Sequence, residues 1–182
     1  MKSYSIILLI ILGTCGYSTE TAQLVKEYLL ASNDYNFERA SQFLDLDYQE
    51  VFIDGSVEIE DLNQLKDFMA WRKIMNSKSR LLSLESSNDT VTTVEKTQHF
   101  MDSILERKPR TFKIKYVVKD DKILKSIIDT MPGHSETVSY NYGKFAEFQE
   151  FCSEEEIELD MGMTANGALQ LKRALELYKK DR

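Results

Sequence analysis

Few residues of this sequence combine a reactive side chain with surroundings that predict chemistry, and His99 is the first of them. It stands in the segment Thr97–Met101, within a run rich in Val and Thr that predicts a β-strand. Imidazole titrates near neutral pH, so a histidine that faces a pocket can act as a general base. Facing inward, His99 would pair with Asp54. On the outer sheet face, or as a hydrogen-bonded core residue, it would have no such role.

The other residues that bind metals or act as nucleophiles show no spacing typical of a site. The second histidine, His134, follows Pro132-Gly133 and is expected in a loop. Two separated histidines without an HExxH motif do not predict a metal site. The sequence has no Gly-rich phosphate loop and no GxSxG motif, so we predict neither a metal nor another cofactor.

Cys152 is one of two cysteines in the sequence. The acidic run Glu154–Glu156 follows it closely, and negative charge nearby raises the pKa of a thiol and suppresses the reactive thiolate. We therefore expect Cys152 to be a small packed side chain and not a nucleophile.

The first sixteen residues predict export from the cytoplasm. Lys2 is followed by the apolar run Ile6–Leu12 and then by Gly13-Thr14-Cys15-Gly16. This pattern is typical of a secretory signal, and the run is far shorter than the ~20 residues of a membrane-spanning helix. Residues 12–15 resemble a bacterial lipoprotein signal, with Thr14 where Gly, Ala or Ser is usual. The resemblance implies that Cys15 is lipidated and anchors the protein to a bacterial membrane in the cell envelope; the alternative is a secreted or periplasmic soluble protein.

The overall composition predicts one folded domain with additional elements at one end. The chain has 182 residues, of which 42% are hydrophobic and 29% charged, with only 7 Gly and 2 Pro. Its net charge of -7 leaves no basic surplus to neutralise phosphates, so we expect no nucleic-acid partner.

Helical periodicity and turn residues divide the N-terminal half into three helices and one short strand. Asn36 and Asp61 are side chains that cap helices, and Asp54-Gly55 marks a turn after the strand. We therefore expect helices over Thr19–Ala31, Asn36–Leu44 and Asp61–Met75, and a strand over Tyr48–Ile53.

From Ser79 onward the apolar residues alternate, as in half-buried strands. Asp120-Asp121 predicts a hairpin turn. The expected strands are Ser79–Glu85, Thr90–Leu105, Phe112–Val118 and Lys122–Met131, and the expected helices after them are Tyr142–Cys152 and Asn166–Lys180. These elements predict an α+β fold, in which N-terminal helices cover one face of a curved antiparallel sheet.

This order of elements resembles the nuclear transport factor 2-like superfamily, which includes the SnoaL-like polyketide cyclases and ketosteroid isomerase. The resemblance is carried by residues 25–37, 43–55 and 112–131. It implies a cone-shaped sheet whose mouth leads to an apolar pocket. On this basis we assign residues 1–16 to the signal, 17–133 to the cone domain and 134–182 to a helical C-terminal extension.

The resemblance also implies roles for particular residues. In the isomerase branch a tyrosine of the first helix and a second acid hold an enolate oxygen, and an aspartate after the first strand moves the proton. Tyr28 and Asp54 match the tyrosine and the aspartate, but the second acid falls near Ile114, which cannot donate a hydrogen bond. Ketosteroid isomerisation is therefore not expected. The candidate pocket residues are Tyr28, Phe52, Asp54, Trp71, His99 and Tyr116; Trp71 either seals the pocket or fills the core.

Three functions fit these observations. We favour an exported binding domain that holds a small apolar ligand or a partner segment in its pocket, without catalysis. The first alternative is a lyase or isomerase in which Asp54 or His99 abstracts a proton while Tyr28 polarises a carbonyl. The second is an envelope interaction module that uses the exposed sheet face or the helix Asn166–Lys180; a homodimer would form through the same sheet face.

Overall fold

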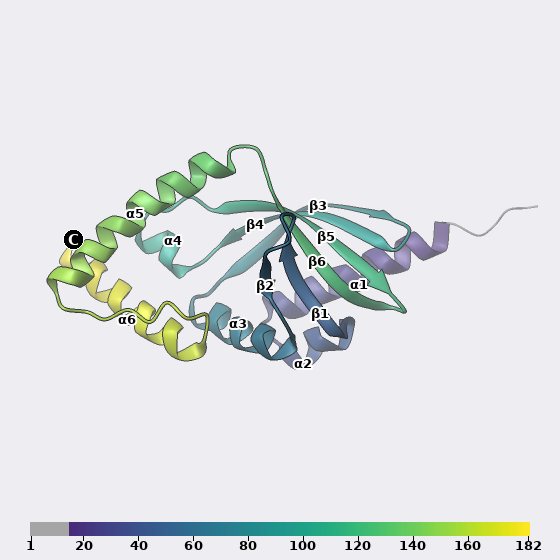
Figure 1. Ribbon diagram of the computed structural model, residues 1–182, viewed down its shortest axis with the longest axis horizontal. Coiled ribbons are helices and arrows are strands. Elements are labelled where there is room, and N and C mark those ends of the chain that lie inside the picture. The colour runs from purple at the N-terminus through teal and green to yellow at the C-terminus, as the bar shows by residue number, and fades with distance from the viewer. Residues whose placement is uncertain (1–14) are drawn as a thin grey trace, which may run out of the picture.

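The computed structural model describes residues 15–182 and shows an α+β fold (Figure 1). A single six-stranded sheet has the strand order β2-β1-β6-β5-β4-β3. Its strands are β1 (Leu44–Phe52), β2 (Val57–Ile59), β3 (Lys78–Ser87), β4 (Thr90–Gln98), β5 (Arg110–Lys119) and β6 (Lys122–Thr130). The predicted fold class, a curved antiparallel sheet packed on N-terminal helices, is confirmed.

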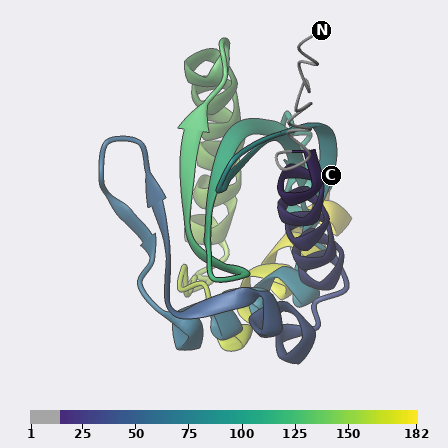
Figure 2. The ribbon, with the colours of Figure 1, turned by 90° about the vertical axis from the view of Figure 1, so that its right-hand side faces the viewer.

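Strands β3 to β6 form an antiparallel meander whose bulges bend it. The register shifts between Leu81 and Ser83 and between Val117 and Val118. Figure 2 shows the sheet arching beside α1 (Cys15–Asn33), which packs against β3 and β4. The chain reverses between β5 and β6 at Asp120-Asp121, where both residues have positive φ, as the predicted turn requires.

One strand pair departs from the predicted antiparallel arrangement. β1 runs parallel to β6, with Glu50 opposite Ser126 and Phe52 opposite Ile128. Hairpin turns predict the pairing of strands that are neighbours along the chain, whereas β1 and β6 are separated by helices and four other strands of the sheet.

Two helices of the N-terminal half begin at the predicted caps. They are α2 (Phe37–Ala40) and α3 (Leu62–Ile74). The Asn36 side chain accepts a hydrogen bond from the Arg39 amide at 2.9 Å, and the Asp61 side chain accepts one from the Gln64 amide at 2.8 Å. The helix predicted over Asn36–Leu44 is too long, because a single 3-10 turn, η1 (Ser41–Phe43), leads into β1 at Leu44, whose side chain is buried in the sheet.

The strand predicted over Thr90–Leu105 is wrong beyond Gln98. A short helix, α4 (Phe100–Ile104), follows β4, and His99 is its N-cap residue. The Phe100 amide donates to the Met75 carbonyl at 2.7 Å, which ties the start of α4 to the end of α3. Helical spacing places Met101 and Leu105 on one buried face, so tertiary packing decides the conformation here.

The main core lies between the concave sheet face and the N-terminal helices. Val25 of α1, Leu65 of α3 and Tyr48, Val91 and Ile123 of the sheet are all buried there. Each such side chain stabilises the fold by ~1.5–3 kcal/mol. This packing fixes α1 and α3 against the sheet and thereby defines the walls of the cone.

The C-terminal extension consists of α5 (His134–Glu154) and α6 (Ala165–Asp181). His134 is the first residue of α5 and does not lie in a loop, contrary to our prediction. The two helices close a second core against α3 and α4, made of Met75, Met101, Leu105, Phe148, Cys152, Ala168, Leu171, Ala174, Leu175 and Tyr178. Cys152 is a buried free thiol whose pKa is raised by burial, as expected of a packed side chain.

The predicted signal lies outside the described residues, except that Cys15 and Gly16 begin α1. Helix α1 therefore starts earlier than the predicted Thr19. Within residues 15–182, none of the helices has the length and apolar character that a membrane span requires.

Candidate functional site

A cavity of about 230 Å³ opens between α1, α3 and the inner face of the sheet, and we call it the cone cavity. Its apolar wall consists of Leu29, Phe52, Leu65, Phe68, Trp71, Phe112, Ile114, Ile128 and Met163. Its polar residues are Tyr28, Ser32, Asn33, Glu50, Glu58, Arg72, Ser77, Ser79, Glu95, Thr97, Arg110 and Tyr116. A mostly apolar pocket with a few convergent polar groups is the usual form of a small-molecule site.

A hydrogen-bonded carboxyl group, Glu95, lies in this wall and is only 3% exposed. The Tyr116 hydroxyl donates to Glu95 Oε1 at 2.8 Å, and the Thr93 hydroxyl donates to the same oxygen at 2.6 Å. Burial raises the pKa of Glu95, although both hydrogen bonds and the Arg72 charge oppose this shift. Glu95 thus holds its proton to a higher pH than an exposed glutamate does, and because both donors use Oε1, neither of these hydrogen bonds occupies Oε2.

A second carboxyl group, Glu50 of β1, belongs to a neighbouring network of hydroxyl groups. The Tyr48 hydroxyl donates to Glu50 Oε1 at 2.8 Å and lies 3.4 Å from the Tyr28 hydroxyl. Burial raises the pKa of Glu50, and the nearby Glu95 charge acts in the same direction. Burial also raises the pKa of Tyr28, which therefore stays a neutral phenol.

Arg72 is the buried cation of the cone cavity. Its guanidinium donates to Ser32 Oγ at 2.5 Å and to Asn33 Oδ1 at 3.4 Å, which joins α3 to the end of α1. Its charge lowers the pKa values of Glu50, Glu95 and Tyr28, in each case less than burial raises them. Arg72 therefore moderates the cost of placing two carboxyl groups in an apolar cavity.

Four of the six predicted pocket residues line the cone cavity. They are Tyr28, Phe52, Trp71 and Tyr116. The rings of Tyr28 and Tyr116 meet edge to face with their centroids 6.0 Å apart. Ile114, where the resemblance would place a second acid, also lines the wall.

Asp54 does not line the cavity, and the expected proton-abstracting role does not fit its position. It is exposed on the turn between β1 and β2, where its Oδ1 accepts from the Ser56 hydroxyl at 2.6 Å and from the Ser56 amide at 2.9 Å. These hydrogen bonds lower the pKa of its carboxyl. An aspartate before a glycine stabilises the turn in this way.

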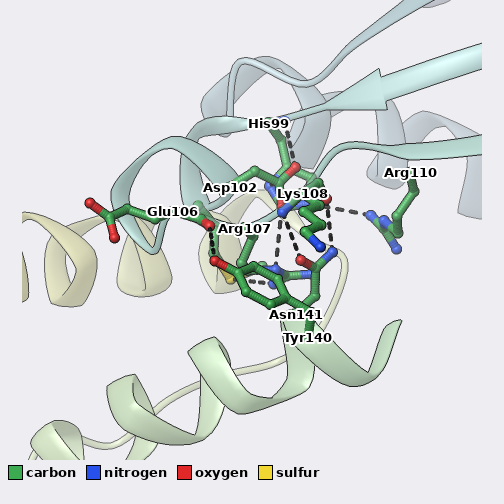
Figure 3. A network of polar contacts seen from close by, with 9 residues as sticks. His99, Asp102, Glu106, Arg107, Lys108, Arg110, Tyr140 and Asn141 are labelled. Atoms are coloured by element: carbon green, nitrogen blue, oxygen red, sulfur yellow. Dashed lines mark hydrogen bonds and ion pairs between the residues drawn. The ribbon is translucent and has the colours of Figure 1, made fainter. Parts of the chain in front are cut away.

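His99 does not line the cone cavity either, and it does not pair with Asp54. Its ring is buried edge-on against Trp71, and its Nδ1 lies 3.6 Å from Asp102 Oδ2 (Figure 3). Burial, with the charges of Arg110 and Arg107, lowers the pKa of His99 to about 3, so the ring is neutral. His99 is a buried residue of the α3–α4 junction, and it contacts two residues of the cavity wall, Trp71 and Arg110.

Sequence reasoning missed Glu50, Glu95 and Arg72. Glu95 continues the inward alternation of Val91 and Thr93, and an acidic residue at an inward strand position was the available signal. The described residues contain no group of three or more His, Cys, Asp or Glu side chains that could hold a metal ion. The carboxyl, phenol and guanidinium groups of the site can form hydrogen bonds with a ligand, and its carboxyl groups can also transfer protons.

No family model and no curated protein matches this sequence. Solved structures do match its fold. An uncharacterised cystatin-fold protein from Novosphingobium aromaticivorans aligns with a TM-score of 0.52 and 13% identity, over 59% of this chain and 96% of its own. A candidate ketosteroid isomerase from Kribbella flavida aligns with a TM-score of 0.51 and 11% identity, over 63% and 79%.

A candidate polyketide cyclase from Sinorhizobium meliloti gives a TM-score of 0.50 and 16% identity, over 62% of this chain and 98% of its own. At these identities the similarity establishes the fold alone. The described chain thus shares its fold, a curved sheet packed on helices, with these structures.

Proposed function

We propose that this protein is a non-catalytic binding domain for a small, largely apolar molecule that carries one carbonyl or hydroxyl oxygen. The observation that carries the proposal is Glu95, a carboxyl group with a raised pKa in an otherwise mainly apolar cavity of about 230 Å³. A protonated carboxyl donates a hydrogen bond, and a neutral oxygen atom is the acceptor that it suits.

A matched pair of probes tests this proposal, namely α-tetralone and tetralin, which differ by one carbonyl oxygen. Trp71 is the only tryptophan of the sequence and lines the cavity, so its fluorescence reports binding. We expect α-tetralone to bind about tenfold more tightly than tetralin, the value of one buried hydrogen bond. Glu95→Leu should abolish that preference, and Glu95→Gln, which keeps a donor, should preserve most of it.

A cavity-filling variant controls for binding elsewhere on the surface. Ile114→Phe should weaken binding of both probes, because Ile114 lines the cavity. Ile127→Phe is the matched control. Ile127 is next to Ile128 of β6, which lines the cavity, and neighbouring strand residues point to opposite faces of the sheet, so Ile127 points away from the cavity. Equal effects of the two substitutions, or equal affinity for the two probes, would contradict the proposal.

A second function, acid–base catalysis, is favoured by the pair of carboxyl groups. Glu50 and Glu95 lie beside neutral phenols, and burial raises the pKa of both carboxyl groups, the direction in which a catalytic carboxyl group is tuned. In this mechanism one ionised carboxylate removes a proton from carbon next to a carbonyl, while the other, protonated carboxyl donates to the carbonyl oxygen. These glutamates take the place that we first gave to Asp54 and His99.

Hydrogen exchange distinguishes catalysis from simple binding. In D₂O, an enzyme of this kind would replace the α-hydrogens of α-tetralone by deuterium, which proton NMR follows directly. Glu50→Gln and Glu95→Gln variants should then lose the exchange while still binding the probe. Binding without exchange above the protein-free rate would leave the binding domain as the function.

We also propose that the protein acts outside the cytoplasm, held to a bacterial membrane by a lipid on Cys15. The sequence Leu12-Gly13-Thr14-Cys15 after a short apolar run supports this proposal. Cells grown with labelled palmitate should incorporate the label into the protein but not into its Cys15→Ser variant. Release of an unlabelled protein into the periplasm or the medium would favour plain secretion. An interaction role and a homodimer through the sheet face stay predictions.

A further inference from the structure

A second cavity of about 220 Å³ lies outside the cone, between the α4–β5 connection and α5. Arg107 and Arg110 form part of its wall, and the apolar side chains of Met101, Val138, Phe145 and Met161 face them. The wall on the α5 side is held firmly, because the Asn141 amide group exchanges two hydrogen bonds with the Lys108 backbone, at 2.7 and 2.8 Å. This cavity combines guanidinium groups with a preformed apolar surface.

Among the described residues, one carboxylate, that of Asp102, lies within ion-pair distance of this pair of arginines, and it contacts Arg107. Arg107 Nε lies 3.3 Å from Asp102 Oδ1, and the other oxygen of Asp102 accepts from the His99 amide at 3.0 Å (Figure 3). The close polar contact of Arg110 is with His99 Nε2 at 3.4 Å, and the His99 ring is neutral. Glu58 interacts with the Arg110 charge only at longer range. The cluster therefore carries a surplus of positive charge in a protein whose net charge is -7.

The hydrogen-bonding capacity of this cluster is only partly used. Arg110 Nε is buried without a hydrogen-bond partner among the described residues, and Arg107 Nε faces Asp102 Oδ1 at 3.3 Å without forming a hydrogen bond with it. One Arg107 terminal nitrogen contacts only the Met101 sulfur, a weak acceptor, at 3.3 Å. Buried donors without acceptors are costly, and a guanidinium group suits the two oxygens of a carboxylate.

The rim of the second cavity is apolar and open to solvent. Val138 is 43% exposed, Tyr142 69% and Met161 53%. Exposed apolar side chains that surround a cavity mark a binding surface more often than isolated ones do. A ligand with an apolar body would cover them while its charged end reaches the arginines.

We propose that the second cavity binds a small monocarboxylate, whose carboxylate is held by Arg107 and Arg110 and whose short apolar body packs against Val138, Phe145 and Met161. One negative charge balances the surplus of the cluster. The site shares Arg110 with the cone cavity but does not depend on the function proposed for that cavity.

Sodium hexanoate and 1-hexanol test this proposal, because they share an apolar chain and differ in the charged group. Titration of the ¹⁵N-labelled protein by NMR gives both affinity and location. We expect hexanoate to shift the backbone amides of residues 138–145 and 161, and to bind at least about tenfold more tightly than hexanol. Equal affinity of the two probes, or hexanoate shifts confined to residues of the cone cavity, would overturn the proposal.

Charge-removing variants identify the groups that hold the carboxylate. Arg107→Gln should weaken hexanoate binding about tenfold and leave hexanol binding unchanged. Lys108→Gln is the matched control, because Lys108 is an exposed cation of the same segment that does not line the cavity. An equal loss of hexanoate affinity in the two variants would show an effect of general surface charge and would overturn the proposed site. If Arg107→Gln does not fold, hexanoate binding by Arg107→Lys and the comparison of hexanoate with hexanol on the unchanged protein still test the site.

Discussion

Glu95 lies in a strand whose other inward residues, Val91 and Thr93, are buried and uncharged. An ionised carboxylate in such a place loses its hydration, and a single nearby guanidinium group does not replace it. Protonation lowers this cost, and it converts an acceptor into a donor. Burial raises the pKa of Glu50 in the same way, so both acids of the cone cavity hold their protons to a higher pH than exposed glutamates do.

Glu95→Gln should change how stability depends on pH. The raised pKa means that, above about pH 4.5, the unfolded chain loses this proton before the folded one does. Stability therefore falls as pH rises from about 4.5 through the folded-state pKa, and Gln removes this fall while it still accepts from Tyr116 and Thr93. Urea unfolding between pH 4 and pH 8 should show the variant gaining stability relative to the parent as pH rises.

Glu85→Gln on β3 supplies the control for this measurement, because Glu85 is exposed. A variant at Glu95 whose unfolding free energy follows the parent curve at every pH would show that the carboxyl is ionised at no cost.

His99 should act on stability in the opposite direction. Its folded-state pKa of about 3 lies below the ordinary value of 6.5, so between these values the unfolded chain binds a proton that the folded chain excludes. Stability is fully present above about pH 6.5 and is lost as pH falls, by up to about 1.4 kcal/mol per pH unit.

His99→Gln removes this titration. We expect the variant to be less stable at pH 7, because a buried ring against Trp71 is lost, but to lose less stability between pH 6.5 and pH 3. Chemical unfolding at several pH values measures both effects. If the variant loses as much stability as the parent between pH 6.5 and pH 3, His99 does not cause this pH dependence.

At the scale of helices and strands, local signals predicted most of the fold. Asn36 and Asp61 cap helices as expected, and Asp120-Asp121 closes a hairpin, because these effects depend on a few adjacent residues. The start of α4 at Phe100 depends instead on a hydrogen bond to Met75 and on packing against α6, which no local pattern contains. The parallel pairing of β1 with β6 also joins segments far apart in the sequence, so no local pattern predicts it.

The site was only partly predictable for the same reason. Tyr28, Phe52, Trp71 and Tyr116 are inward-facing aromatic residues of regular elements, and periodicity locates them. Asp54 matched a loose pattern, yet an aspartate before a glycine satisfies its own turn. The role of Glu95 comes from burial beside Tyr116 of another strand, which the sequence places far apart, and that of Glu50 from burial in the cavity wall.

Gly167 marks a close approach between α6 and the connector that precedes it. A Cβ atom at this position would lie 2.3 Å from the Gly162 carbonyl oxygen and 3.2 Å from that of Asp160. Gly167→Ala should therefore destabilise the protein by about 1–3 kcal/mol, the cost of overpacking against backbone. Thermal and urea unfolding measure the change.

Gly143→Ala in α5 is the matched control, since nothing lies within 4 Å of an added Cβ there. Alanine is the better helix former, so we expect this variant to be more stable by about 0.5–1 kcal/mol. If Gly167→Ala is also more stable than the parent, the backbone at Gly162 must move to make room for the added methyl group.

For the whole molecule, the C-terminal helices complete a core that α3 and α4 cannot close alone. Met75, Met101 and Leu105 are buried against α5 and α6. Removal of residues 134–182 should expose this surface, and we expect the truncated chain to aggregate or to lose a cooperative thermal transition. Light scattering and circular dichroism check the outcome. A soluble remainder that unfolds cooperatively would instead make the extension a separable interaction module.

Arg110 borders both cavities. An anion beside it would interact with the same guanidinium charge that borders the cone cavity, so binding in the two cavities would be thermodynamically linked. Linkage of this kind is reciprocal: whatever factor a carboxylate imposes on the affinity of the cone for its ligand, that ligand imposes on the carboxylate. Through Arg110, a carboxylate bound in the second cavity would then change the affinity of the cone cavity for its apolar ligand.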